Sequence, residues 1–215
     1  MGILLLIPSL VLNVFLFQKI QKGSQGIKVI GVIDGDTLVL EGKVRLRLRY
    51  LDAPELEFCG GKEAKEKLES LVENKKVVLK ERILDAQGRP MALVYVGHKL
   101  VNEEMLKSGW VRYHTDNTPE KDILKATYEL ARKEKRGIFG PKCYQKENLE
   151  NPACVIKGNI DKVTGARTYH FPGCVQYDFT VVEKDIGEQW FCTEEEAQKA
   201  GFERSKRCPK GKFKP

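Results

Sequence analysis

The stretch from Val32 to Glu55 constrains the fold of this chain most strongly, because it is typical of a β-hairpin. An alternating run at 37–40 meets the turn signal Glu41-Gly42, and a second alternating run follows at 44–51. Alternating side chains of a strand lie on opposite faces. One face of the second run holds Val44, Leu46, Leu48 and Tyr50, and the other holds Arg45, Arg47 and Arg49. The hairpin therefore predicts a sheet with one apolar face and one face lined by arginines.

Carboxylates flank this hairpin at both ends. Asp34 and Asp36 precede the first strand, Asp52 and Glu55 follow the second, and strand pairing brings the two pairs together. Carboxylates in close proximity raise one another's pKa, so such clusters normally surround a cation or catalytic machinery. Calcium and magnesium are the cations that suit hard oxygen ligands. A charged surface hairpin of an ordinary barrel is the alternative, but the order and spacing of Asp-Gly-Asp-Thr and Arg-x(4)-Asp-x-Pro-Glu favour a site.

With these motifs, the hairpin resembles the core of the staphylococcal nuclease (thermonuclease) family. Three later parts of the chain extend the resemblance over residues 27 to 140: Asp85–Arg89 with Ala92–Val96, Leu100–Glu104 with Ser108-Gly109, and Ala131–Gly140. The resemblance implies an α+β fold, with a five-stranded OB-fold β-barrel and about three helices. It also implies a calcium-dependent phosphodiesterase, a sugar-nonspecific endonuclease that hydrolyses DNA and RNA.

The resemblance and the chemistry of phosphodiester cleavage assign the same metal ligands. Cleavage needs a nucleophilic water, a cation and donors for the charge of the transition state. Asp36 and Asp52 would bind Ca²⁺ through their side chains, and Ala53 through its backbone carbonyl. The family usually has threonine at this last position, but only the carbonyl is needed, so alanine should keep the metal.

The catalytic groups follow from the same reasoning. Glu55 would orient or deprotonate the attacking water. Arg47 and Arg89 would each contact two phosphate oxygens, a task for which lysine is a poor substitute. Three further residues are candidates for nucleic-acid binding, with solvated, paired or core positions as the alternative: Arg45, Arg49 and Tyr113. Before Gly88-Arg89, where the family often has lysine and tyrosine, the chain has Ala86 and Gln87, which implies weaker nucleotide affinity.

The length and charge of the chain suggest more than the barrel. The chain has 215 residues and a net charge of +7, which favours polyanions such as DNA and RNA as partners. We expect a monomer with an OB-fold nuclease domain and a small C-terminal α+β module. The predicted division is a signal or anchor with its linker at 1–26, the nuclease domain at 27–142, a linker at 143–153, the Cys-containing module at 154–208 and a basic tail at 209–215.

An uncharged apolar run at the N-terminus, Ile3–Phe17, has the length of a signal-peptide core. A buried core helix is the alternative. No basic residue precedes the run, whereas Lys19 and Lys22 follow it, which is unusual for a cleaved signal. We therefore expect an uncleaved or inefficiently cleaved membrane anchor with the nuclease outside, so that the protein is located in the cell envelope or is secreted.

Six cysteines, an even number in a chain expected to be exported, favour disulfides. Cys143 and Cys154 flank the predicted linker and could close it as a loop. Zinc is the alternative, because the C-terminal module resembles the small zinc module of the bacterial DNA-repair protein Ada, and His170, Cys174 and Cys208 fall on its ligand positions. The fourth position is Ser205, and this missing ligand favours disulfides or free thiols over a closed zinc site.

Two other functions are compatible with the fold: a nucleic-acid-binding module without catalysis, and an envelope-associated protein in which the C-terminal module has the main role. A pure binding module has no use for a complete set of catalytic groups. Such a set is present here: Asp36, Arg47, Asp52, Glu55 and Arg89. The sequence therefore favours the nuclease.

Overall fold

The computed structural model describes residues 26–115 and 121–213. The predicted anchor at 3–17 lies outside these ranges. None of the helices within them has the length and apolar character needed to cross a membrane.

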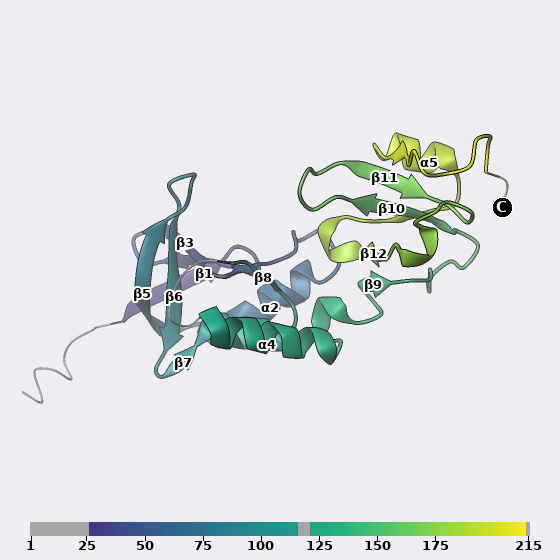
Figure 1. The fold of residues 1–215 in the computed structure, drawn as a ribbon. Helices are drawn as coiled ribbons and strands as arrows, with labels where there is room; N and C mark the ends of the chain where they lie inside the picture. Colours follow the sequence, from purple (N-terminus) through teal and green to yellow (C-terminus); the bar gives the residue numbers. More distant parts are fainter. Residues whose placement is uncertain (1–25, 116–120, 214–215) are drawn as a thin grey trace, which may run out of the picture.

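The first unit is built around a closed, mixed β-barrel of five strands. Its strands are β1 (Ile27–Val32), β2 (Thr37–Leu40), β3 (Val44–Leu48), β5 (Lys76–Leu84) and β6 (Pro90–Val96). They pair in the order β3-β2-β1-β5-β6, and parallel pairing of β3 with β6 closes the barrel. This closure confirms the predicted OB-fold barrel (Figure 1).

Helices and short strands cover the barrel. They are β4 (Leu51–Asp52), α2 (Gly61–Val72), β7 (Lys99–Leu100), α3 (Val101–Ser108), β8 (Arg112–Tyr113), α4 (Lys121–Lys133) and the 3-10 helix η1 (Gly137–Phe139). Leucines of the hairpin, including Leu38, Leu46 and Leu48, form the core together with Leu68 of α2 and Leu106 of α3. The alternation predicted for the hairpin therefore places its apolar face inside, except at Val44, which is 47% exposed beside the turn.

A buried amide links α3 to the barrel. Asn102 is fully buried; its Oδ1 accepts from the backbone N–H of Val94 at 2.9 Å, and its Nδ2 donates to the carbonyl of Arg49 at 2.8 Å. The two backbone groups lie on β6 and just beyond β3, the strands whose pairing closes the barrel. Because an unmade hydrogen bond is costly inside a core, Asn102 stabilises this closure.

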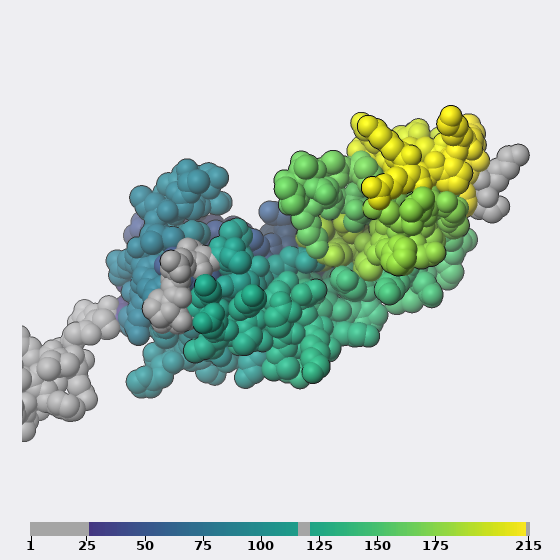
Figure 2. Space-filling view, viewed as in Figure 1, coloured from purple at the N-terminus to yellow at the C-terminus, as the bar shows by residue number. Residues whose placement is uncertain are grey.

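The second unit is a small α+β module with its own core. Its main sheet has the order β13-β10-β11-β14, with β10 (Ile156–Ile160), β11 (Arg167–His170), β13 (Trp190–Phe191) and β14 (Glu203–Arg204). Helix α5 (Glu194–Lys199) begins at a capping box of Thr193 and Glu196, as its sequence predicts. Aromatic residues dominate the core, among them Tyr169, Phe191 and Phe202. Figure 2 shows the two units as two lobes along one long axis.

The segment 143–153, predicted as a linker, is ordered against the second unit. Its strand β9 (Tyr144–Gln145) pairs with β12 (Val182–Glu183), which lies between the 3-10 helices η2 (Tyr177–Phe179) and η3 (Lys184–Ile186). The Trp190 indole also donates to the side chain of Gln145 at 2.8 Å. The domain boundaries themselves stay a prediction.

All six cysteines are paired, as Cys59–Cys143, Cys154–Cys192 and Cys174–Cys208. The predicted Cys143–Cys154 loop is therefore wrong. Cys143 pairs with Cys59 of the first unit, and Cys154 pairs with Cys192, the residue that follows β13. The zinc alternative keeps a geometric basis, since ligand atoms of His170, Cys174 and Cys208 lie within 4.8 Å of one another. Within the described residues, the buried Nδ1 of His170 has no hydrogen-bond partner.

We expect the full chain, purified without reductant and then denatured, to show no reactive thiol and to contain no zinc, because a small core of this kind is stabilised by cross-links. Thiol titration beside elemental analysis measures both quantities. The same protein reduced in denaturant is the control and should show six thiols. About one zinc per chain, accompanied by reactive thiols, would contradict the disulfide at Cys174 and Cys208.

Candidate active site

A tight turn between β1 and β2 positions Asp36. A Cβ atom at Gly35 would lie 2.4 Å from the Cβ of Ala64 on α2 and 2.7 Å from the Cβ of Ala53. Only glycine therefore lets the turn lie this close to both segments. The Asp34 carboxylate accepts from the backbone N–H of Asp36 at 3.0 Å and holds the turn in shape.

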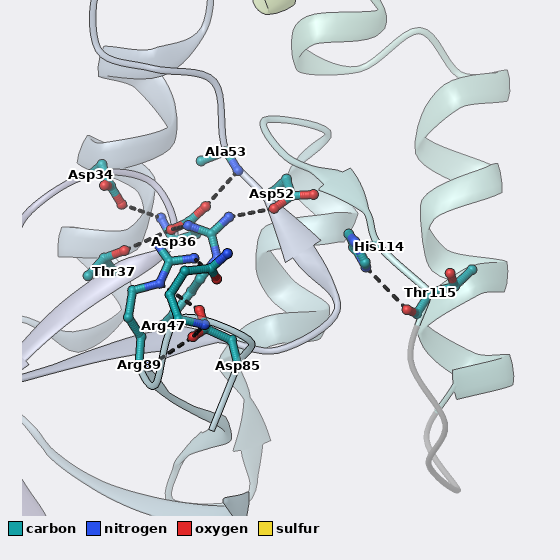
Figure 3. A network of polar contacts seen from close by, with 11 residues as sticks. Asp34, Asp36, Thr37, Arg47, Asp52, Ala53, Asp85, Arg89, His114 and Thr115 are labelled. Carbon is teal, nitrogen blue, oxygen red and sulfur yellow. Dashed lines mark hydrogen bonds and ion pairs between the residues drawn. The ribbon is translucent and has the colours of Figure 1, made fainter. Parts of the chain in front are cut away.

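Asp36 is buried, with 2% of its surface exposed, and three donors surround its carboxylate. Oδ1 accepts from Arg47 Nη1 at 2.7 Å and from Thr37 Oγ1 at 2.8 Å, and Oδ2 accepts from the backbone N–H of Ala53 at 2.9 Å. Arg47 reaches it because Thr37 and Arg47 face each other across β2 and β3. The other end of the guanidinium, Nη2, donates to Asp52 Oδ1, so that Arg47 bridges two carboxylates (Figure 3).

Burial raises the pKa of Asp36 to about 7, although Arg47 and the Ala53 N–H act in the opposite direction. The nearby charge of Asp34 raises this pKa further. Burial alone would lower the pKa of Arg47, but its ion pairs with Asp36 and Asp52 raise it, so the guanidinium is charged. Asp36 is thus a carboxylate whose ionised form requires positive charge beside it near neutral pH.

The donor chemistry of this cluster fits a hard cation. The guanidinium of Arg47 already places positive charge between Asp36 and Asp52, and both carboxylates together with the carbonyl of Ala53 are oxygen ligands of the type that calcium accepts. Asp52 is half exposed and leaves the position open to solvent. The carboxylate oxygens of Asp34, Asp36 and Asp52 do not all lie within 4.8 Å of one another. Within the described residues, the one group of three possible side-chain ligands that meets this distance is His170, Cys174 and Cys208.

Arg89 lies on the same cavity as the cluster. A turn closed by the Asp85 carboxylate holds Arg89: Oδ1 accepts from the backbone N–H of Arg89 at 2.8 Å, and Oδ2 accepts from its Nε at 2.6 Å. A cavity of about 470 Å³ is lined by Arg47, Asp52, Arg89 and His114, among others. Its two guanidinium groups and its open side make it suitable for a phosphate-bearing ligand.

Glu55 lies in the loop after β4 and is exposed. The loop turns immediately after it, with the backbone N–H of Phe58 donating to the Glu55 carbonyl at 2.9 Å. No side chain of the described residues donates to its carboxylate, so this group is available to a water or a substrate.

The three candidates for nucleic-acid binding differ in position. Arg45 is exposed on β3, as predicted. Arg49 is buried instead, and its Nη1 donates to the carbonyl of Glu81 at 3.1 Å and pairs with its carboxylate at 3.3 Å. The strand ends at Leu48, and Tyr50 has a φ of 68°, so the predicted alternation stops before Arg49. Its burial and its pair with Glu81 favour the alternative named for Arg49, a residue paired with an acidic neighbour, while its role in nucleic-acid binding stays a prediction.

Tyr113 is half-buried and packs among aromatic rings. Its ring is stacked with Tyr50, with 6.3 Å between centroids, and lies 6.0 Å from Tyr128. This packing favours the core position named as the alternative, while stacking on a base stays a prediction.

Two contributions were missed by sequence analysis. Thr37 donates to Asp36 and could have been inferred from the Asp-Gly-Asp-Thr motif. Arg112 is opposite Asp52 in the antiparallel pair of β4 and β8, and its carboxylate partners are Glu183 and Asp185. No local pattern could have found these partners, because they lie 71 and 73 residues away along the chain.

Comparisons with known proteins agree with this geometry. A family model described as "Staphylococcal nuclease homologue" matches residues 45–140. A thermonuclease of Staphylococcus hyicus is 32% identical over 128 residues, which are 54% of this chain and 76% of that protein. An uncharacterized endonuclease of Escherichia coli O157:H7 is 34% identical over 120 residues, which are 52% of this chain and 75% of that protein.

Longer relatives match over the same part of the chain. A probable staphylococcal-like nuclease of Oryza sativa subsp. japonica is 37% identical over 97 residues, which are 44% of this chain but only 26% of that protein. The chain thus spans about a quarter of the plant relative and three quarters of the bacterial ones. With the barrel, the hairpin motifs and this coverage of the two bacterial relatives, the chain belongs to the staphylococcal nuclease family.

Proposed function

We propose that the protein is a calcium-dependent endonuclease that hydrolyses phosphodiester bonds in both DNA and RNA. One observation carries the proposal: the Arg47 guanidinium lies between the carboxylates of Asp36 and Asp52 on a cavity that also holds Arg89. In this arrangement the two carboxylates would bind a cation, and the guanidinium beside them would bind a phosphate. The relatives named as endonuclease and thermonuclease support the same activity.

Different residues would bind the phosphate and activate the attacking water. Arg47 and Arg89 would donate to the non-bridging phosphate oxygens and stabilise the charge that develops on them. Glu55 would accept a proton from the water whose oxygen attacks phosphorus. The bond from phosphorus to the leaving sugar oxygen breaks, and this oxygen takes a proton from solvent.

Calcium would be held by the Asp36 and Asp52 side chains and by the carbonyl of Ala53, and when bound it would polarise the phosphate and neutralise the carboxylates. Asp34 would contribute by fixing the turn that carries Asp36. Nothing in these contacts reads a base or a 2′-hydroxyl, which supports action on both nucleic acids. Exposed Arg45 extends the basic strand face and would contact the substrate backbone.

We further propose that the protein acts outside the cytoplasm, in the cell envelope or secreted, as a monomer. Three disulfides support an oxidising compartment. The apolar run at 3–17 would serve as the signal or membrane anchor.

The purified full chain should cleave single-stranded DNA and RNA internally with calcium, and should lose most of this activity in chelator, because without the cation Arg47 stays paired with both carboxylates and their negative charge repels the phosphate. Gel analysis of end-labelled and circular substrates measures cleavage and its internal mode. Re-addition of calcium to the chelated sample is the control. Undiminished cleavage in chelator would contradict the metal assignment, and binding without cleavage under all conditions would favour a catalytically silent module.

Replacing Glu55 by glutamine should lower kcat by about a hundredfold or more, because the amide cannot accept the proton of the attacking water. Calcium affinity should be unchanged, since Glu55 is not among the proposed ligands. The matched control is Glu57→Gln, which removes another exposed carboxylate from the same loop and should leave kcat at the parental value. Equal turnover by Glu55→Gln and Glu57→Gln would place the general base elsewhere.

A further inference from the structure

A turn of the second unit contacts the strand that pairs with Asp52 and the loop that carries Glu55. This turn, residues 183–187, comprises the end of β12, the 3-10 helix η3 and Gly187. It contacts β8, the partner strand of β4, and it also contacts the loop 53–60 that carries Glu55. Through this turn the second unit therefore contacts segments that adjoin the site.

The contact with β8 is a buried ion-pair network. Arg112 Nε is 2.7 Å from Asp185 Oδ2, its Nη2 is 2.9 Å from Asp185 Oδ1, and its Nη2 is also 2.6 Å from Glu183 Oε2. The Asp185 side chain is 1% exposed. Removing one partner of such a pair leaves a buried charge uncompensated, which makes the network sensitive to a single substitution.

Arg112 is also the register partner of Asp52. The strands β4 and β8 have two residues each, with Leu51 opposite Tyr113 and Asp52 opposite Arg112. A pair this short has few hydrogen bonds of its own, so the position of β4 depends on what holds β8. The pair of Arg112 with Asp185 provides this anchor from the second unit.

The loop 53–60 has a second set of anchors on the same turn. The backbone N–H of Cys59 donates to the Lys184 carbonyl at 3.4 Å, and the disulfide links Cys59 to Cys143, whose carbonyl accepts from the Lys184 N–H at 2.8 Å. Gly187 has a φ of 86°, and a Cβ atom there would lie 2.8 Å from the Phe58 ring. The loop that carries Glu55 is thus packed against the turn, and no residue larger than glycine fits at position 187.

We propose that the turn 183–187 is a positioning element of the active site, with Arg112 and Asp185 as positioning residues that act through β4 and the loop 53–60. This inference rests on the proposed nuclease function, in which Asp52 binds the cation and Glu55 accepts a proton. Metal and base must be held within a fraction of an ångström for efficient catalysis. The second unit is then part of the nuclease site.

The test compares Asp185→Asn with the parent in the full chain. The amide keeps the shape and one hydrogen bond but removes the more buried of the two carboxylate charges that pair with Arg112. We expect kcat to fall by about tenfold to a hundredfold and the dissociation constant for calcium to rise severalfold, at a folded fraction equal to the parent's. Calorimetric titration with calcium chloride and circular dichroism measure the last two quantities.

The matched control is Glu150→Gln, which removes an exposed carboxylate paired with Lys184 of the same turn at 2.6 Å. It should leave kcat and calcium affinity at parental values. If Asp185→Asn does not fold, Glu183→Gln decides, since it removes the other carboxylate of the turn that pairs with Arg112. In either variant, the amides of residues 53–60 should exchange hydrogen at least about tenfold faster than in the parent, because their anchors are weakened.

Parental kcat, calcium affinity and amide exchange in a folded Asp185→Asn or Glu183→Gln variant would overturn the positioning role. Amide exchange also separates this inference from the function on which it rests. A parent without nuclease activity would overturn the proposed function, while faster exchange of residues 53–60 in the variants would still support positioning by the turn.

Discussion

The arginine bridge between two aspartates is the interaction on which the site depends. Arg47 lies on β3, Asp36 lies in the turn before β2, and Asp52 lies on the short strand β4. The bridge therefore fixes three segments relative to one another at the point where β3 pairs with β6 and closes the barrel. Burial disfavours the ionised form of Asp36, and the guanidinium of Arg47 acts in the opposite direction.

The same constraint explains why such a site can accept both a cation and a phosphate. In the proposed function a divalent cation would neutralise the carboxylates, and the Arg47 guanidinium would then be available to the phosphate oxygens. The second unit would add rigidity, because its turn 183–187 pairs with Arg112 and accepts a hydrogen bond from Cys59 in the loop that carries Glu55. Loops that carry catalytic groups are normally the least stable parts of a fold, and this one is held covalently.

Much of the barrel could be predicted from sequence, because period-two alternation and turn residues are local signals. Leu46 and Leu48 are buried as predicted, and the cluster of Asp36, Arg47 and Asp52 follows from hairpin pairing. Arg49 departs from the pattern because β3 ends at Leu48, three residues before the predicted end of the run at Leu51, and Tyr50 then has a positive φ that its sequence does not predict.

Contacts between the units could not be predicted. Cysteine count indicates pairing but not connectivity, so the sequence offers Cys154, the next cysteine along the chain, as a possible partner of Cys143, whereas the actual partner is Cys59. The partner of Arg112 depends likewise on how two separately folded cores meet.

Crystals grown with calcium and measured for anomalous scattering test the central claim most directly. The account predicts an anomalous peak beside the carboxylates of Asp36 and Asp52 and the carbonyl of Ala53, with the Arg47 guanidinium moved off at least one carboxylate toward the cavity. A calcium-free crystal of the same form provides the reference. The absence of a peak at calcium concentrations that support cleavage, with Arg47 still bridging both aspartates, would contradict the account and show the bridge to be purely structural.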